Sequence, residues 1–327
     1  MAAAFTSDKI DLLLYGPSKP IVDNGFPDQF VLHKIESFDE LDKLDADVAK
    51  KIRGVAITDS IPAGAPMQSR FPKLEIMSSF GVGYDHVDST HAREHNIVVT
   101  NTPDVLTEEV ADTALGLLIA TLREFIKADK YVRSGLWLGG KYPLSVGSLR
   151  DRKVGIVGMG RIGQAIARRI EASQVPVVYH SRKPAEGLSY KHYPDLMEMA
   201  KAVDTMIVIV PGGPSTAKMI NADVLKALGP RGVLINVARG SVIDEPALIA
   251  ALKSGTILAA GLDVFVDEPK VPDEFKTMQN VVLLPHIGSA SVVTRNAMDQ
   301  LVVDNLKAWF AGKPPLTPVA ETPVKTR

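Results

Sequence analysis

Three residues in the second half of the chain have side chains suited to acid–base chemistry on a carbonyl group: Arg239, Glu268 and His286. Histidine can give up and recover a proton near neutral pH, and a neighbouring carboxylate favours its charged form. Arginine keeps its proton, so Arg239 is suited to polarise a carbonyl or to hold a carboxylate. This combination suits hydride transfer to a ketone, because the carbonyl oxygen must then receive a proton.

The position of these residues in the sequence supports that interpretation. They follow the apolar runs "VLINVA", "AAGLDVFVD" and "VVLLP". In an open parallel sheet, ligands bind beyond the carboxyl ends of the strands, so three distant residues can meet in one crevice. Other roles stay open: His286 could complete a strand end, Arg239 could form a surface ion pair, and Glu268 competes with Asp267 in what could be a plain turn.

A second pattern, "KVGIVGMGRIGQAIARRI", predicts a strand, a glycine-rich turn and a helix. Gly158 permits the tight turn, Gly160 lets a pyrophosphate approach the backbone, and Gly163 lets the helix pack on the strand. The amides of Arg161 and Ile162 would then face the phosphates from the helix N-terminus. The alternative is a glycine-rich turn without a ligand. A Walker phosphate loop is excluded because no Gly-Lys-Ser/Thr follows.

The next strand ends in "VVYHSRKP", where an NAD-binding protein ordinarily carries an acid for the ribose hydroxyls. Here Ser181, Arg182 and Lys183 offer a hydroxyl and two cations, which suit a 2′-phosphate. We therefore expect NADPH to be preferred over NADH, with NADH use possible. The alternative is a solvated basic turn.

The elements that must position these residues form an alternating pattern from Lys153 onward. Short β-branched runs alternate with amphipathic helical patterns, which predicts a doubly wound parallel sheet. The first hundred residues repeat the pattern more faintly and predict a smaller α/β lobe, with a boundary near Asn101 to Pro103. We expect residues 38–52 and 107–128 to be helices, the second opened by Thr107 and buried against another lobe or subunit. The Pro-rich tail from Lys313 is expected to be loosely ordered.

Composition narrows the function classes. The 327 residues carry 37 Lys and Arg against 38 Asp and Glu, so no broad electrostatic field indicates nucleic acid or an acidic membrane. The absence of cysteine excludes disulfides, thiol nucleophiles and thiolate metal sites, and we expect no metal site. The longest apolar stretch, Thr113 to Thr121, is far short of the ~20 residues of a membrane span, and the N-terminus lacks a secretory pattern. We expect a cytoplasmic protein.

Several blocks resemble the D-isomer-specific 2-hydroxyacid dehydrogenase family: "VGIVGMGRIGQAIARR", "LINVARGSVIDEPALIAAL", "GLDVFVDEP", "LLPHIGSAS", "SSFGVGYDHVD" and "NTPDVLTEEVADTALGLLI". The resemblance implies that Arg239, Glu268 and His286 are catalytic, and that the amides of Val82 and Gly83 hold the substrate carboxylate. It places Ser289 near the substrate. It adds cofactor-lining positions beyond the glycine loop and the basic turn: Thr107, Val210, Pro211, Val237, Ala238, Asp263 and Gly288.

The same resemblance implies a Rossmann domain at residues 102–289. A flavodoxin-like α/β substrate domain would be discontinuous, at 1–101 and 290–327. Within the family the chain is similar to NADPH-using glyoxylate and hydroxypyruvate reductases, and also to hydroxyphenylpyruvate reductases. A homodimer is implied, and Trp137 could reach a partner's site or simply pack. The alternatives are an aryl-pyruvate reductase and a non-catalytic, corepressor-like dinucleotide sensor.

Overall fold

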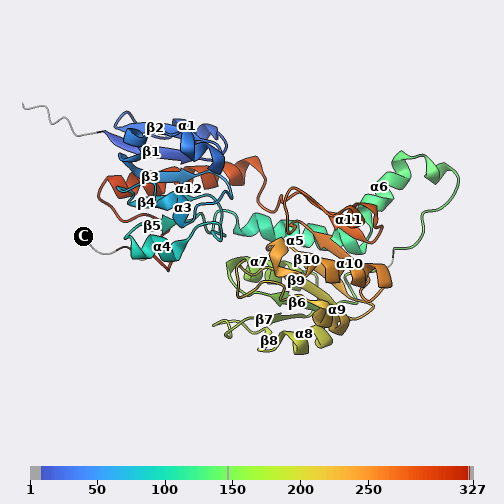
Figure 1. Ribbon diagram of the computed structural model, residues 1–327. Coiled ribbons are helices and arrows are strands. Elements are labelled where there is room, and N and C mark those ends of the chain that lie inside the picture. The colour runs from blue at the N-terminus through green and yellow to red at the C-terminus, as the bar shows by residue number, and fades with distance from the viewer. Residues whose placement is uncertain (1–8, 146, 323, 325–327) are drawn as a thin grey trace, which may run out of the picture. The chain divides into compact units, whose positions relative to one another are not determined.

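The structure, a computed structural model, describes residues 9–145, 147–322 and 324, which form two compact units (Figure 1). Unit 1 comprises the chain up to Leu106 together with the chain from Ser291. Unit 2 is the continuous segment Thr107–Ala290. Each unit is built on its own parallel sheet. The assignment of one unit to the substrate and the other to the cofactor stays a prediction.

Unit 2 has a seven-stranded parallel sheet in the order β12-β11-β10-β9-β6-β7-β8. The strands are β6 (Val154–Val157), β7 (Val177–His180), β8 (Lys191–Tyr193), β9 (Thr205–Val208), β10 (Val233–Asn236), β11 (Ala259–Leu262) and β12 (Val281–Leu283). The short apolar runs that were predicted as strands from Lys153 onward are β6, β7 and β9 to β12. The prediction of a doubly wound parallel sheet is confirmed. The edge strand β8 was not predicted, because "KHY" is short and polar. The first strand of unit 2, β6, lies in the interior of this sheet. The strands β7 and β8 follow on one side of it and β9 to β12 on the other, so the strand order reverses at β6.

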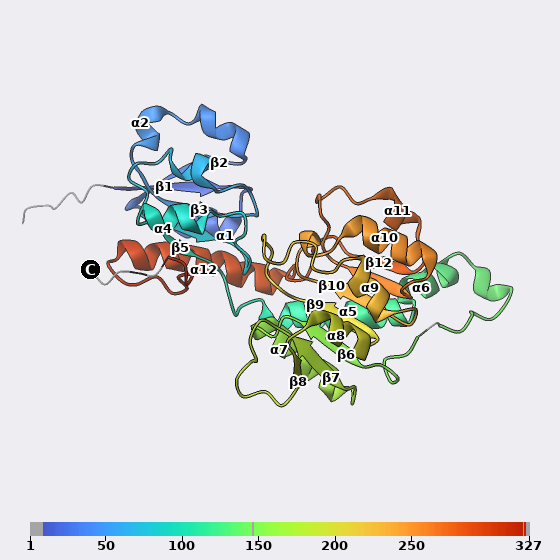
Figure 2. The same ribbon diagram turned by 60° about the horizontal axis from the view of Figure 1, so that its bottom comes forward.

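Helices cover both faces of this sheet (Figures 1 and 2). On one face α5 packs against α7, and on the other α8, α9 and α10 pack in a row. Their bounds are α5 (Thr107–Leu122), α7 (Arg161–Ala172), α8 (Leu196–Ala202), α9 (Ala222–Leu228) and α10 (Glu245–Ser254). The shorter elements of the unit are α6 (Phe125–Arg133), η2 (Leu136–Leu138), η3 (Gly240–Val242) and α11 (Asp273–Thr277).

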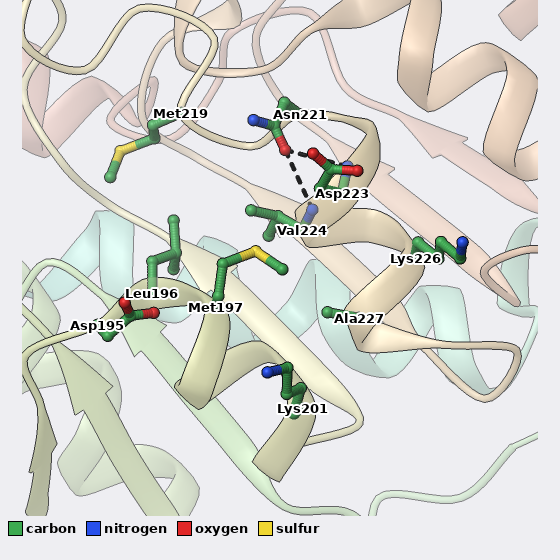
Figure 3. Close-up of a pocket in the computed structure, with 10 residues that line it drawn as sticks. All are labelled: Asp195, Leu196, Met197, Lys201, Met219, Asn221, Asp223, Val224, Lys226 and Ala227. Carbon is green, nitrogen blue, oxygen red and sulfur yellow. Dashed lines mark hydrogen bonds between the residues drawn. The ribbon is translucent and has the colours of Figure 1, made fainter.

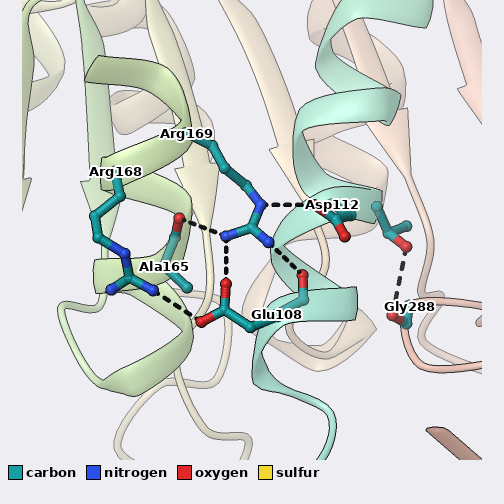
Figure 4. Close-up of polar contacts among 7 residues, drawn as sticks. Glu108, Asp112, Ala165, Arg168, Arg169 and Gly288 are labelled. Carbon is teal, nitrogen blue, oxygen red and sulfur yellow. Dashed lines mark hydrogen bonds and ion pairs between the residues drawn. The ribbon is translucent and has the colours of Figure 1, made fainter. Parts of the chain in front are cut away.

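A polar cluster joins α7, the helix that follows the glycine loop, to α5 (Figure 4). Arg169 places Nη1 2.7 Å from Glu108 Oε2 and Nε 2.7 Å from Asp112 Oδ1, while Arg168 Nη2 lies 2.8 Å from Glu108 Oε1. Arg169 also donates to the carbonyls of Ala165 and Glu108. Several charges that share partners in this way fix geometry better than an isolated surface pair. The cluster ties the start of α5 to the middle of α7.

The expected single helix at residues 107–128 is wrong. Helix α5 ends at Leu122, Glu124 adopts a left-handed conformation with φ 52°, and α6 starts at Phe125. The buried face of α5 packs against β10, β11, β12 and α7 of its own unit. Unit 2 thus buries one face of α5, whereas Leu115 and Ile119 are only partly buried.

Unit 1 has a five-stranded parallel sheet in the order β2-β1-β3-β4-β5. The strands are β1 (Ile10–Tyr15), β2 (Phe30–Ile35), β3 (Ile52–Ile57), β4 (Ile76–Ser79) and β5 (Val98–Thr100). The helices are α1 (Pro20–Asn24), α2 (Ala46–Ala49), α3 (Ala65–Gln68), α4 (Ser89–Glu94) and α12 (Val292–Phe310), with one 3₁₀ segment, η1 (Phe38–Lys43). Helix α12 packs on β3, β4 and α1.

Two expectations for unit 1 are wrong. Residues 38–52 do not form one helix: the 3₁₀ segment ends at Lys43, and Asp45 caps the separate helix α2, since its side chain accepts from the amides of Asp47 and Val48. The tail is not loosely ordered as far as residue 322. Pro318 bridges Thr100, and the Thr322 hydroxyl accepts from the Val99 amide at 2.9 Å. The last part of the predicted tail lies outside the described residues.

Candidate active site

The structure brings Glu268 and His286 into direct contact at the carboxyl edge of the unit 2 sheet. His286 follows β12 and Glu268 follows the neighbouring strand β11. The Nδ1 atom of His286 lies 2.7 Å from Glu268 Oε2, and Glu268 Oε1 accepts from the Phe265 amide at 2.9 Å. Both carboxylate oxygens are thereby fixed. The imidazole stays partly exposed, with 42% of its side-chain surface accessible.

The charge state of Glu268 follows from this geometry. Burial alone would raise the pKa of Glu268. The hydrogen bond to His286, the Phe265 amide and the positive charges of His286 and Arg239 outweigh burial and hold this pKa below its ordinary value. Glu268 is therefore a carboxylate at neutral pH.

Asp263, at the end of β11, holds the backbone of the His286 segment. His286 has a left-handed φ of 54°, which is unfavourable for a residue with a side chain. Three successive amides stabilise it: His286 N donates to the Asp263 carbonyl at 2.8 Å, and Ile287 N and Gly288 N donate to the Asp263 carboxylate at 2.7 and 2.8 Å. Asp263 is only 1% exposed, and its burial raises its pKa despite these bonds. Sequence reasoning assigned Asp263 to the cofactor and did not detect this support for His286.

Arg239 lies in the loop after β10, next to β11 in the sheet. Its Nη1 donates to the Ala238 carbonyl at 2.8 Å, and its charge acts on Glu268. The loop touches the β11 loop at Gly240, where an added Cβ would lie 1.9 Å from the Phe265 carbonyl carbon. Only glycine permits this approach, which sets the backbone of Arg239 beside the loop that carries Glu268. All three predicted catalytic residues therefore come from adjacent strand ends.

The glycine loop after β6 has the conformation that its pattern predicted. Gly158 has φ 103°, and a Cβ there would lie 2.4 Å from the Ile209 carbonyl oxygen. A Cβ on Gly163 would lie 2.1 Å from the Gly158 carbonyl oxygen. A Cβ on Gly160 would meet nothing within 4 Å, so this position is open to a ligand. Gly160 also caps α7, whose first-turn amides, including those of Arg161 and Ile162, have no intrahelical acceptors.

The basic turn after β7 lies next to the glycine loop, because β7 is the neighbour of β6. Arg182 and Lys183 are exposed, and neither cation pairs with a carboxylate among the residues that the structure describes. The Ser181 hydroxyl donates to the Lys183 carbonyl at 2.6 Å, so Ser181 stabilises the turn itself. The two cations are available to an anionic ligand.

The remaining predicted positions of unit 2 surround this edge. Val210 and Pro211 follow β9, and Val237 and Ala238 follow β10. Gly288 and Ser289 follow His286, and the Thr113 hydroxyl of α5 donates to the Gly288 carbonyl at 3.4 Å. Thr107 is the first residue of α5. The strand order thus places the basic turn, the glycine loop and the His286 loop along one edge of one sheet.

The predicted carboxylate-holding loop is in unit 1, after β4. The Val82 carbonyl accepts from Asn101 Nδ2 at 2.9 Å, and the Gly81 amide donates to the Thr102 hydroxyl at 2.9 Å. Within the described ranges, no acceptor is bonded to the amides of Val82 and Gly83. These two amides are free to bind an anion.

Two cations near this loop escaped sequence reasoning. Lys19 Nζ lies 3.2 Å from the centroid of the Phe80 ring, and Arg295 Cζ lies 5.1 Å from the same centroid. Lys19 pairs with Asp299 at 3.4 Å. Lys19, Phe80 and Arg295 come from three remote segments, and no spacing in the sequence connects them.

One open groove of unit 2 includes none of the predicted residues (Figure 3). It has a volume of about 700 Å³ between α8 and α9 and is lined in part by Met197, Met219 and Val224. No histidine lines the groove, so we place the proposed chemistry at the strand ends. No three His, Asp or Glu side chains of the described chain cluster as metal ligands, and none of its helices combines the length and apolarity of a membrane span.

The fold of unit 2 defines a dinucleotide-binding α/β protein. Residues 115–288 match the model of the D-isomer specific 2-hydroxyacid dehydrogenase, NAD binding domain. The chain belongs to this family of oxidoreductases, which use a nicotinamide dinucleotide.

Similar proteins extend the match over almost the whole chain. The NADPH-dependent glyoxylate/hydroxypyruvate reductase of Sinorhizobium meliloti, solved with NADP and malonate, is 55% identical, with a TM-score of 0.93 over 98% of this chain and 99% of that one. A glyoxylate/hydroxypyruvate reductase of Arabidopsis thaliana is 45% identical over 95% of this chain and 99% of its own. Hydroxyphenylpyruvate reductase of Plectranthus scutellarioides is 48% identical over 83% of this chain and 86% of its own.

Proposed function

We propose that this protein reduces a small 2-keto acid, glyoxylate or hydroxypyruvate, to the D-2-hydroxy acid with NADPH. The observation that carries the proposal is the 2.7 Å contact between His286 and Glu268 at the same sheet edge as the glycine loop. The names of the Sinorhizobium and Arabidopsis relatives support the substrate class. They also favour an enzyme over a dinucleotide sensor.

The residues of unit 2 fit a nicotinamide dinucleotide. Open space at Gly160 and the first-turn amides of α7 suit the pyrophosphate. When bound, the reduced nicotinamide supplies a hydride. His286 would then give a proton to the keto oxygen from Nε2, because Nδ1 is engaged by Glu268. Glu268 would stabilise the imidazolium before transfer, and Arg239 would polarise the carbonyl or hold the substrate carboxylate.

The preference for NADPH depends on Arg182 and Lys183. If contacts to the 2′-phosphate contribute about 3 kcal/mol, NADPH binds about a hundredfold more tightly than NADH. Arg182→Ala should remove most of this preference. Arg150→Ala is the matched control, because Arg150 is an exposed arginine on the chain that enters β6, at the opposite edge of the sheet.

For the substrate carboxylate we propose the amides of Val82 and Gly83, with Ser289 as a further contact. Support comes from the unbonded amides and from Lys19 and Arg295, two cations that lie against the Phe80 ring next to this loop. Unit 1, at about residues 1–101 and 290–327, would be the substrate domain, and residues 102–289 the cofactor domain.

We also propose that the protein is a homodimer and cytoplasmic. Support for the dimer is an exposed apolar surface on α6 and η2, described in the Discussion. The location rests on the cysteine-free, near-neutral composition, and cell fractionation tests it.

The test is a steady-state panel of glyoxylate, hydroxypyruvate, pyruvate and hydroxyphenylpyruvate, each with NADPH and with NADH. We expect the highest kcat/KM for glyoxylate or hydroxypyruvate with NADPH. The Plectranthus relative makes an aryl-pyruvate the second candidate, and a preference for hydroxyphenylpyruvate would establish it. Equal kcat/KM with both cofactors would overturn the NADPH assignment, and no oxidation with any substrate would overturn the function.

A further inference from the structure

The basic turn after β7 is held at both ends by side chains that do not belong to it. At its start, the Ser181 carbonyl lies 2.9 Å from Nε2 of His192. A carbonyl only accepts hydrogen bonds, so His192 donates from Nε2. At the other end, the Ala185 amide donates to the Tyr179 hydroxyl at 3.0 Å. The turn that carries Arg182 and Lys183 is therefore anchored on either side of the two cations.

The sheet places the two anchoring side chains together. In the parallel pairing of β7 and β8, Tyr179 is the partner of His192. Their rings contact each other, with centroids 5.1 Å apart. Tyr179 is only 2% exposed, so its hydroxyl has a fixed position. His180 adds a further link between the strands, from Nδ1 to the Tyr193 carbonyl at 2.9 Å. The edge strand β8, which carries no predicted site residue, thereby supports the basic turn.

We infer that His192 and Tyr179 are positioning residues for recognition of the 2′-phosphate, an inference that rests on the proposed use of NADPH. Arginine and lysine lose much side-chain and backbone freedom when they bind a phosphate. A turn already anchored at both ends loses less, so its cations grip the phosphate more tightly. NADH carries an uncharged hydroxyl in place of the 2′-phosphate, so it gains much less from cations that are held in position. Removing an anchor should therefore weaken NADPH binding selectively, although both cations remain.

The experiment measures dissociation constants of NADPH and NADH, which differ only in the 2′-phosphate, by calorimetric titration without substrate. The variants are His192→Leu, His192→Gln and Tyr179→Phe. We expect His192→Leu and Tyr179→Phe to weaken NADPH binding by about tenfold and NADH binding by less than about twofold. His192→Gln should recover most of the lost affinity, because the glutamine amide can donate to the Ser181 carbonyl in place of Nε2.

The outcomes separate this inference from the proposed function. If the unmodified protein binds both cofactors equally, the NADPH assignment fails and this inference fails with it. If it prefers NADPH and both His192→Leu and Tyr179→Phe keep that preference, only the inference is overturned. An equal loss for both cofactors would mean that the anchors merely stabilise the fold. Should His192→Leu fail to fold, Tyr179→Phe, which deletes one oxygen, decides alone.

Discussion

At the scale of single residues, the chemistry depends on a carboxylate that keeps its charge beside a partly exposed imidazole. The pKa of Glu268 is held low, so this carboxylate is ionised throughout the neutral range. In the proposed reaction, charged His286 gives a proton to the keto oxygen, and the carboxylate of Glu268 beside it would stabilise that charge.

Glu268→Gln tests this role, because it keeps the shape and removes the charge. Without the anion, the positive charge that His286 carries before proton transfer is less well stabilised, so we expect kcat for reduction with saturating NADPH to fall by about tenfold. The measurement is steady-state kcat at one fixed pH near neutrality. An unchanged kcat would show that Glu268 does not act through the charge of His286.

The sequence predicted the three catalytic candidates because residue type and position after a strand are both local properties. The same reasoning could not find the role of Asp263, because its contacts span more than twenty residues and depend on the left-handed backbone of His286. Lys19 and Arg295 were missed for the same reason, since they meet only at Phe80 in the folded unit.

At the scale of elements, the three glycines of the loop after β6 differ in their surroundings: two are packed against the backbone, and one has open space beside it. Gly158 and Gly163 approach backbone atoms closely, whereas Gly160 faces open space. The fold requires the first two glycines, whereas the third leaves space that the proposed pyrophosphate would occupy.

We predict that alanine substitutions at two glycines of this loop affect different properties: one mainly lowers the stability of the protein, and the other mainly weakens cofactor binding. Gly158→Ala should destabilise the protein by about 3 kcal/mol, because its φ is 103° and its Cβ would collide with the Ile209 carbonyl. Gly160→Ala should destabilise the protein by only about 1 kcal/mol, because alanine is a poorer N-cap of α7 than glycine, and should weaken NADPH binding by at least about tenfold. Thermal unfolding and cofactor titration measure the two effects. Normal cofactor affinity in Gly160→Ala would remove the pyrophosphate from this loop.

Most helices and strands were predicted from strong hydrophobic patterns, and the elements that were missed or given wrong bounds have weak patterns. Apart from β8, the strands from β6 to β12 are mostly apolar at consecutive positions, which is typical of strands covered on both faces. The strand β8, "KHY", is short and polar, and in β2, "FVLHKI", His33 and Lys34 interrupt the apolar run. Helix α5 ends at Leu122 without a glycine or proline. Pairing in the sheet and packing decide these cases, and neither is a local property.

At the scale of the whole molecule, the segment that follows α5 in unit 2 exposes several large apolar side chains. We define the arm surface as the exposed apolar residues of α6, η2 and the chain that follows: Phe125, Ile126, Val132, Leu136, Trp137, Leu138 and Leu144. Trp137 is 64% exposed and Leu138 is 97% exposed. An apolar surface of this kind is typical of a protein contact, and a second copy of the chain would cover it in the proposed homodimer.

Leu138→Lys tests this arrangement, because a charge in the middle of the arm surface opposes its burial. We expect light scattering after size exclusion to give twice the 35.2 kDa chain mass for the unmodified protein and a lower average mass for the variant. Leu316→Lys, at an exposed leucine of unit 1, is the control and should keep the mass. An unmodified protein that is monomeric, or a variant with the same mass, would contradict the proposal.

The central claim is that His286 supplies the proton for reduction by bound NADPH. The most direct measurement is a single turnover, in which protein loaded with NADPH is mixed with hydroxypyruvate and the loss of reduced nicotinamide is followed by absorbance. For His286→Asn we predict NADPH affinity within about twofold of the unmodified protein and a rate lower by about 100- to 10,000-fold. His95→Asn, at the exposed histidine that follows α4, should react at the unmodified rate. A His286→Asn protein that binds NADPH and reacts at nearly the unmodified rate would contradict the claim.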